Sequence, residues 1–91
     1  MTGEVRNNEA EHRYELEVEG QLALAAYRLR DGQITFTHTE VPDALEGRGI
    51  GSRLVRAALD DARALGLKVV PACPFVKHYM DKHPETRDLL A

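Results

Sequence analysis

The stretch that most constrains the fold runs from Leu45 to Arg56 (LEGRGIGSRLVR), where three glycines fall within five positions directly before a helical pattern. From Ile50 onward, apolar residues recur at helical spacing, which predicts one amphipathic helix that ends near Gly66. A chain of 91 residues can build only one small core, so most other elements must pack against this helix. The glycines therefore stand at the entrance of the main helix.

Two strand patterns open the chain. Residues 12–18 alternate apolar and charged side chains, which is typical of a strand with one wet face. Residues 22–29 are apolar on both faces apart from Arg28, which predicts a central strand. Asp31-Gly32 then gives a strong hairpin signal.

The third strand follows the hairpin and covers residues 34–39. Pro42 ends it, because proline cannot donate to a strand ladder. Strict alternation along this strand predicts that His38 shares the apolar face of Ile34 and Phe36.

After the helix, residues 67–73 (LKVVPAC) predict a buried strand that begins near Lys68, and residues 75–82 predict a second helix. A helix between the third and fourth strands is what a parallel crossover needs. We therefore expect one α/β (α+β) domain over residues 1–91, with a mixed, mostly antiparallel sheet in the order β-β-β-α-β-α. Polar residues dominate positions 1–8, where we expect fraying.

Composition excludes several functional classes. The net charge is −3, which argues against nucleic acid as the default partner, and no apolar run approaches the length of a membrane span. Cys73 is the single cysteine and the chain opens without a secretory leader, so we expect a cytoplasmic protein. The histidines and Cys73 lack a zinc-site spacing, so no metal is expected. No hydrolase triad is recognisable either.

The glycines have two interpretations. A helix N-terminus carries unpaired N–H groups and partial positive charge, so glycines there let an anion approach the backbone. The string matches neither the nucleotide-binding phosphate loop nor the dinucleotide-binding turn. The alternative is that Gly47, Gly49 and Gly51 only make a sharp strand-to-helix turn with close packing.

Several motifs in order make the pattern specific. The segments THTEVP, GRGIG and LKVVPACPF, followed by Tyr79 and His83-Pro84, resemble the small single-domain proteins of the GNAT superfamily, the acetyl-CoA-dependent N-acetyltransferases. The resemblance covers nearly the whole chain from Tyr14 to Pro84. It implies a minimal GNAT-like fold with a coenzyme A cleft between splayed strands.

The resemblance also implies a cofactor-binding set. The family's turn places Gln or Arg where this chain has Glu46, so we expect Glu46 to point away from the pyrophosphate while Arg48 supplies positive charge. The pantetheine arm would lie between the end of the third strand and the fourth strand. The implied cofactor-binding residues are Thr39, Glu40, Val41, Glu46, Gly47, Arg48, Gly49, Ile50, Gly51 and Ser52.

Three side chains are candidates for catalysis by this resemblance. Cys73 could accept the acetyl group as a thiolate, or it could simply pack as a small hydrophobic residue. His38 could deprotonate Cys73 or an incoming amine, or it could be a hydrogen-bonded core histidine. Tyr79 matches the superfamily tyrosine that protonates the leaving thiolate of coenzyme A, or it packs.

The resemblance predicts an acetyl-CoA-binding acetyltransferase that acts on an unidentified amine acceptor, which could be a protein. Because the first strand begins by about His12, we expect no N-terminal helical segment to shape the acceptor site. Two alternatives stay open: a coenzyme A or acyl-CoA binding module without turnover, and an interaction domain that has lost the ligand. We expect a monomer or a weak homodimer.

Overall fold

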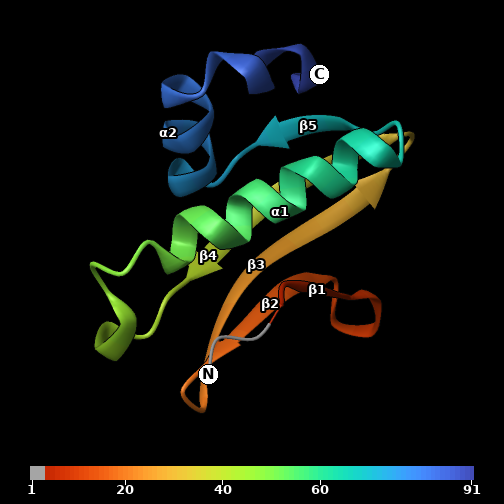
Figure 1. The fold of residues 1–91 in the computed structure, drawn as a ribbon. Helices are drawn as coiled ribbons and strands as arrows, with labels where there is room; N and C mark the ends of the chain where they lie inside the picture. The colour runs from red at the N-terminus through yellow and green to blue at the C-terminus, as the bar shows by residue number, and fades with distance from the viewer. Residues whose placement is uncertain (1–3) are drawn as a thin grey trace.

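The computed structural model describes residues 4–91, which form a five-stranded sheet with two α-helices (Figure 1). The strands are β1 (Arg6–Asn8), β2 (Arg13–Val18), β3 (Gln21–Arg30), β4 (Gln33–Glu40) and β5 (Lys68–Pro71). The helices are α1 (Ile50–Ala64) and α2 (Pro74–Lys82), with 3₁₀ turns at Glu9–Glu11, Asp43–Leu45 and Pro84–Leu89.

The sheet order is β1-β2-β3-β4-β5, antiparallel through β4 and parallel between β4 and β5. The expected mixed, mostly antiparallel sheet is confirmed, and β3 is central as predicted. The structure adds β1, which the sequence analysis missed. Its residues pair with β2, with Arg6 opposite Glu15. The expected fraying is therefore wrong for residues 6–8, and residues 1–3 lie outside the described part of the chain.

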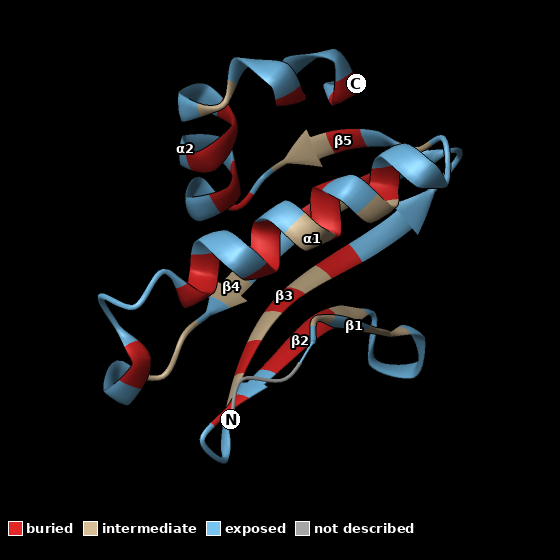
Figure 2. Cartoon of the chain, in the orientation of Figure 1, coloured by how far each residue is buried: buried red, intermediate tan, exposed pale blue. Residues whose placement is uncertain are grey.

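Helix α1 lies across one face of the sheet, and its buried stripe faces the strands (Figures 1 and 2). Leu54 and Leu59 of the helix are buried in one hydrophobic cluster with Leu16 and Phe36 of the strands. The Tyr14 hydroxyl also donates to Asp61 at 2.5 Å, which ties β2 to α1. The predicted amphipathic helix thus holds the core together.

A β-bulge interrupts the pairing of β3 with β4. Tyr27 lies opposite Phe36, but the preceding residue of β3, Ala26, lies opposite His38, so Thr37 is the additional residue. One extra residue reverses which side chains face the core beyond that point. The bulge therefore shifts the end of β4 out of the alternation that the sequence predicts.

The two edges of the sheet are short. β1 contains three residues and β5 contains four. The free side of β5 also receives the C-terminus, because Val69 forms a parallel bridge with Leu90 and accepts a 3.0 Å hydrogen bond from the Ala91 N–H. Neither edge presents a long row of unpaired backbone groups.

Across residues 4–91, we find no helix with the length and apolar character that a membrane crossing requires.

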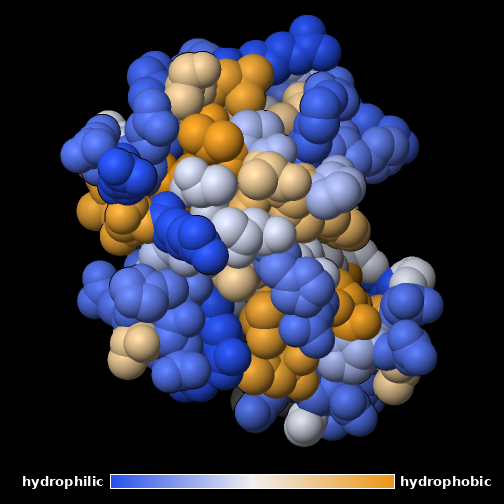
Figure 3. Space-filling view, turned by 180° about the vertical axis from the view of Figure 1, so that it is seen from behind, coloured by the Kyte–Doolittle hydropathy of each residue, from blue (hydrophilic) through white to orange (hydrophobic). Residues whose placement is uncertain are grey.

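The face of the sheet opposite α1 carries no helix among the described residues. Half-buried apolar side chains, including Leu22 and Leu24 of β3, lie there between charged ones, and Figure 3 shows this mixture from behind. The most buried charged group, Glu15 of β2, also belongs to this face. Its carboxylate is only 2% exposed and accepts hydrogen bonds from Arg6, Asn8 and Arg13, the last at 2.6 Å.

The hydrogen bond from Arg13 is the largest cause that lowers the pKa of Glu15 below its usual value near 4.5. Because the folded-state pKa is lowered, ionised Glu15 stabilises the fold fully above its unfolded-state pKa. This stabilisation is lost as the pH falls through the folded-state pKa. We expect Glu15→Gln to lower the free energy of unfolding by about 2 kcal/mol at pH 7, because three donors lose a charged acceptor.

Denaturant unfolding at pH 7 and below pH 4 measures this effect, and the difference from wild type should shrink at the lower pH. Glu17→Gln, an exposed change on the same strand, is the control and should alter stability by less than about 0.5 kcal/mol. Equal stability of the two variants at pH 7 would contradict this role for Glu15.

Candidate functional site

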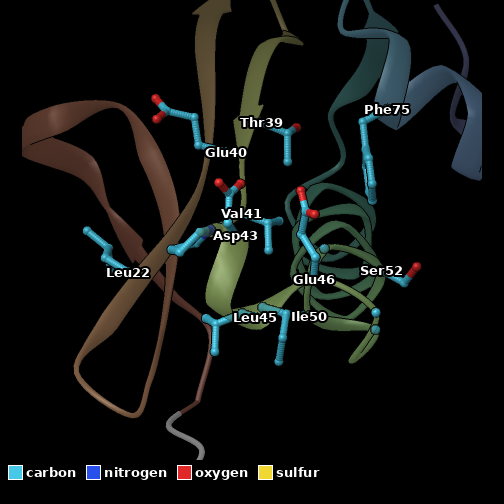
Figure 4. Close-up of a pocket in the computed structure, with 14 residues that line it drawn as sticks. Leu22, Thr39, Glu40, Val41, Asp43, Leu45, Glu46, Ile50, Ser52 and Phe75 are labelled. Atoms are coloured by element: carbon cyan, nitrogen blue, oxygen red, sulfur yellow. The ribbon is translucent and has the colours of Figure 1, made fainter.

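The main pocket opens where β4 ends and α1 begins, and has a volume of about 800 Å³ (Figure 4). Its walls come from the end of β4, the connection to α1, the first turn of α1 and the start of α2. The lining residues are Leu22, Thr39, Glu40, Val41, Pro42, Asp43, Leu45, Glu46, Gly47, Gly49, Ile50, Gly51, Ser52 and Phe75.

The pocket exists because β4 and β5 separate. Their parallel pairing extends as far as Phe36 opposite Pro71, and the Cys73 N–H then donates to the Phe36 carbonyl at 2.8 Å. Beyond this point β5 gives way to α2, while β4 continues beside β3 as far as Glu40. The expected splaying of these strands is therefore present, and it begins at the bulge.

The glycine loop forms the floor of the pocket. Gly47 and Gly49 have φ angles of +80° and +72°, in the left-handed region that favours glycine. A Cβ atom at either position would meet no heavy atom within 4 Å, so both residues expose their backbone to open space. Gly49 is also the N-cap of α1, and the free N–H groups of the first turn follow it.

Gly51 has a different role. A Cβ atom there would lie 2.6 Å from Cζ of Phe75, so the absence of a side chain lets the Phe75 ring pack on the first turn of α1. Figure 4 shows this ring reaching from α2 toward the helix start near Ser52. Gly51 therefore allows close packing, as the second interpretation expects, whereas Gly47 and Gly49 make an open turn, and anion binding there stays a prediction.

The charges of the loop are arranged opposite to expectation. Glu46 lines the pocket, whereas Arg48 does not, because its guanidinium forms an ion pair with Glu19 in the turn between β2 and β3. In this structure the two side chains therefore have the reverse of the expected orientations, and the role of Arg48 toward a pyrophosphate stays a prediction. Every charged residue that lines this pocket is acidic: Glu40, Asp43 and Glu46.

Cys73 lies directly behind the pocket wall. It is 5% exposed, carries a free thiol and is the N-cap of α2. The Sγ atom lies 3.3 Å from Oγ1 of Thr39, a residue that does line the pocket. The thiol is therefore separated from the pocket by one side chain of β4.

His38 does not accompany Cys73. Because the bulge reverses the alternation, His38 faces the open side of the sheet, where its side chain is 59% exposed and its Nε2 lies 3.0 Å from a carboxylate oxygen of Glu40. Thr39 takes the inward position instead. The predictions that His38 shares a face with Phe36, is a core histidine or deprotonates Cys73 are thus wrong, whereas contact with an incoming amine is compatible with its exposure.

Tyr79 is also placed elsewhere. It lines a second pocket of about 750 Å³ together with Arg56, Asp60 and His83, and its ring stacks on His83 with centroids 3.9 Å apart. Burial raises the pKa of its hydroxyl. The structure therefore does not bring Tyr79 to the main pocket, and its expected role as an acid for the leaving thiolate is not supported.

The main pocket gathers nine of the ten residues expected to bind the cofactor, all except Arg48. None of Cys73, His38 and Tyr79 lines it. Sequence reasoning missed Leu22, Pro42, Asp43, Leu45 and Phe75 as lining residues. Phe75 could have been found, because its place in the CPF motif follows the strand that ends at the pocket.

Within residues 4–91, no group of three or more His, Cys, Asp or Glu side chains is arranged to hold a metal ion.

Comparison with known proteins gives three findings. The family model for the GCN5-related N-acetyl-transferase matches residues 13–89. A GCN5-like protein from Staphylococcus aureus, solved by NMR, superimposes with a TM-score of 0.75 at 32% identity, covering 97% of this chain and 87% of that one.

The third finding comes from curated proteins. Protein NATD1 of Gallus gallus and of Homo sapiens each share 41% identity over 51 residues, which is 56% of this chain. The alignment spans 46% of the chicken protein and 45% of the human one, so this chain matches about half the length of these relatives.

The contact between Gly51 and Phe75 can be tested by a double substitution. In the wild-type background, we expect Gly51→Ala either to leave the free energy of unfolding nearly unchanged or to reduce it, because the new methyl group displaces the Phe75 ring. In a Phe75→Ala background, the same change should raise stability by about 0.5–1 kcal/mol, since alanine favours a helix over glycine. Urea unfolding of the four proteins measures this coupling, and equal effects in both backgrounds would contradict the contact.

Proposed function

Because the chain belongs to the GCN5-related N-acetyl-transferase family, we propose that it binds acetyl-CoA in the main pocket and transfers the acetyl group to an amine. The observation that carries this proposal is the separation of β4 from β5 directly beside the open N-terminus of α1. A cofactor with a long arm and a diphosphate needs both features. The opening between the strands would hold the arm, and the N-terminus of α1 would bind the diphosphate.

The residues of the pocket fit this cofactor. Gly47 and Gly49 leave open space where a side chain would stand, so a diphosphate could approach the N–H groups of the first turn. Ser52, in that same turn, adds an exposed hydroxyl. Half-buried Val41 and the Phe75 ring offer apolar contact for the arm.

The cofactor supplies an activated thioester, and the chain supplies the groups around it. In our proposal Cys73 attacks the thioester carbonyl as a thiolate, so that a new C–S bond forms on the protein while the bond to coenzyme A breaks. The amine then attacks this acetyl-cysteine, the C–S bond to Cys73 breaks, and solvent carries the proton of the amine to the released thiolate. A reducing compartment such as the cytoplasm would keep the thiol free.

A second candidate function is a coenzyme A binding module without turnover. Two observations favour it: Tyr79 lies in a different pocket, and the lining of the main pocket is acidic. The first removes the expected acid for the leaving thiolate. The second weakens electrostatic attraction for an anionic cofactor.

Substitution of Ser52 tests the proposed anion site. Ser52→Asp places a carboxylate in the first turn of α1, where it favours the helix but repels a diphosphate. We expect calorimetry to show coenzyme A affinity reduced about tenfold or more, with no loss of thermal stability. Ser52→Asn has the same shape without the charge and should stay within about twofold of wild type. Wild-type affinity in Ser52→Asp would contradict the site.

The covalent step has its own test. After incubation with acetyl-CoA, we expect the intact mass of the wild type to rise by one acetyl group, whereas Cys73→Ala gains none and still binds coenzyme A. Cys73 is the single cysteine, so a thiol-linked acetyl group has one possible location. If Cys73→Ala transfers acetyl to an amine at the wild-type rate, the cysteine only packs.

A further inference from the structure

The cation of the glycine loop is held away from the pocket. Arg48 stands between Gly47 and Gly49, both of which line the pocket, yet its guanidinium pairs with Glu19. The Glu19 and Arg48 side chains are 58% and 46% exposed, so solvent reaches both partners. This ion pair connects the loop before α1 to the turn between β2 and β3.

An anion that enters the pocket meets an unfavourable set of side chains. The three charged lining residues, Glu40, Asp43 and Glu46, are all acidic. Backbone N–H groups at the start of α1 would then have to hold the anion against these carboxylates. Arg48 is the cation whose chain neighbours already form the pocket floor.

We propose that Glu19 sets the affinity of the pocket for its anionic cofactor by competing for Arg48. The carboxylate of Glu19 occupies the guanidinium in the free protein, and a bound diphosphate takes its place. Binding therefore exchanges one ion pair for another, and the cost of breaking the Glu19–Arg48 pair reduces the net attraction between Arg48 and the diphosphate. This inference rests on the proposed function.

The geometry of the two loops allows the exchange. Gly47 and Gly49 flank Arg48 and both have positive φ angles, so the loop that carries the arginine has no Cβ atom on either side of it. Glu19 and Gly20 also have positive φ angles, +51° and +77°, and form the tight turn between two strands. The carboxylate thus sits on a fixed hairpin, and the arginine sits on the open loop.

The guanidinium of Arg48 also holds the pKa of Glu19 below its usual value. Glu19 therefore stays ionised at neutral pH, as the competition requires.

Calorimetric titration with coenzyme A tests the inference on four proteins: wild type, Glu19→Gln, Arg48→Gln and the double variant. We expect Glu19→Gln to tighten binding about twofold to fivefold, which is the range of an exposed ion pair, and Arg48→Gln to weaken it. In the Arg48→Gln background, Glu19→Gln should change the affinity by less than about 1.5-fold, because no guanidinium remains to be released.

Asp31→Asn provides a matched control. Asp31 precedes Gly32 in the other tight hairpin, at φ +50°, and its removal changes the net charge by the same amount, from −3 to −2. Its carboxylate lies 3.6 Å from the Arg30 guanidinium, and Asp31 does not line the main pocket. We expect its affinity to equal that of wild type, and thermal unfolding confirms that each variant is folded.

The outcomes separate this inference from the proposed function. If wild type binds coenzyme A and Glu19→Gln binds equally well, the competition is overturned while the site stands. If Glu19→Gln tightens binding equally with and without Arg48, simple repulsion between carboxylate and ligand explains it, and the competition is again overturned. If the wild type shows no binding at millimolar coenzyme A, the proposed function is overturned, and the exchange of ion pairs is overturned with it.

Discussion

The additional residue in β4 decides which side chains at the end of this strand face inward and which face the open side of the sheet. At Thr37 the strand gains one residue over its partner β3, so the side chains beyond it exchange faces. His38 then faces the open side of the sheet, and Thr39 faces inward to the thiol of Cys73. Pairing with β5 ends one residue before the bulge, at Phe36, which leaves the opening where the pocket forms.

The electrostatics of the pocket combine a favourable backbone with unfavourable side chains. The start of α1 offers N–H groups and partial positive charge, while Glu40, Asp43 and Glu46 surround it with negative charge. The nearest arginine of the loop is engaged by Glu19. In our proposal, an anionic ligand of this pocket would therefore depend on backbone contacts more than on side-chain charge.

The sequence predicted the order of the main elements because periodicity reports burial: the stripe of α1 and the alternation of β2 are direct consequences of packing against one core. It failed for His38, since counting by two assumes that no residue is inserted, and a bulge leaves no clear local signature. It failed for Glu46 and Arg48 because their orientations depend on loop φ angles and on Glu19, which is distant in sequence. Tyr79 was misplaced because a motif gives position along a helix but not the face it presents to a neighbour.

The short and covered edges of the sheet bear on how copies of this protein behave when crowded. An exposed strand edge is a template onto which another chain can add, and long edges therefore promote fibrous association. Here one edge offers only the three residues of β1, and the other is capped by the chain's own last residues through Val69. Leu90 and Ala91 thus cover this edge, and their removal would uncover β5 without removing a core side chain, because Leu90 is 43% exposed.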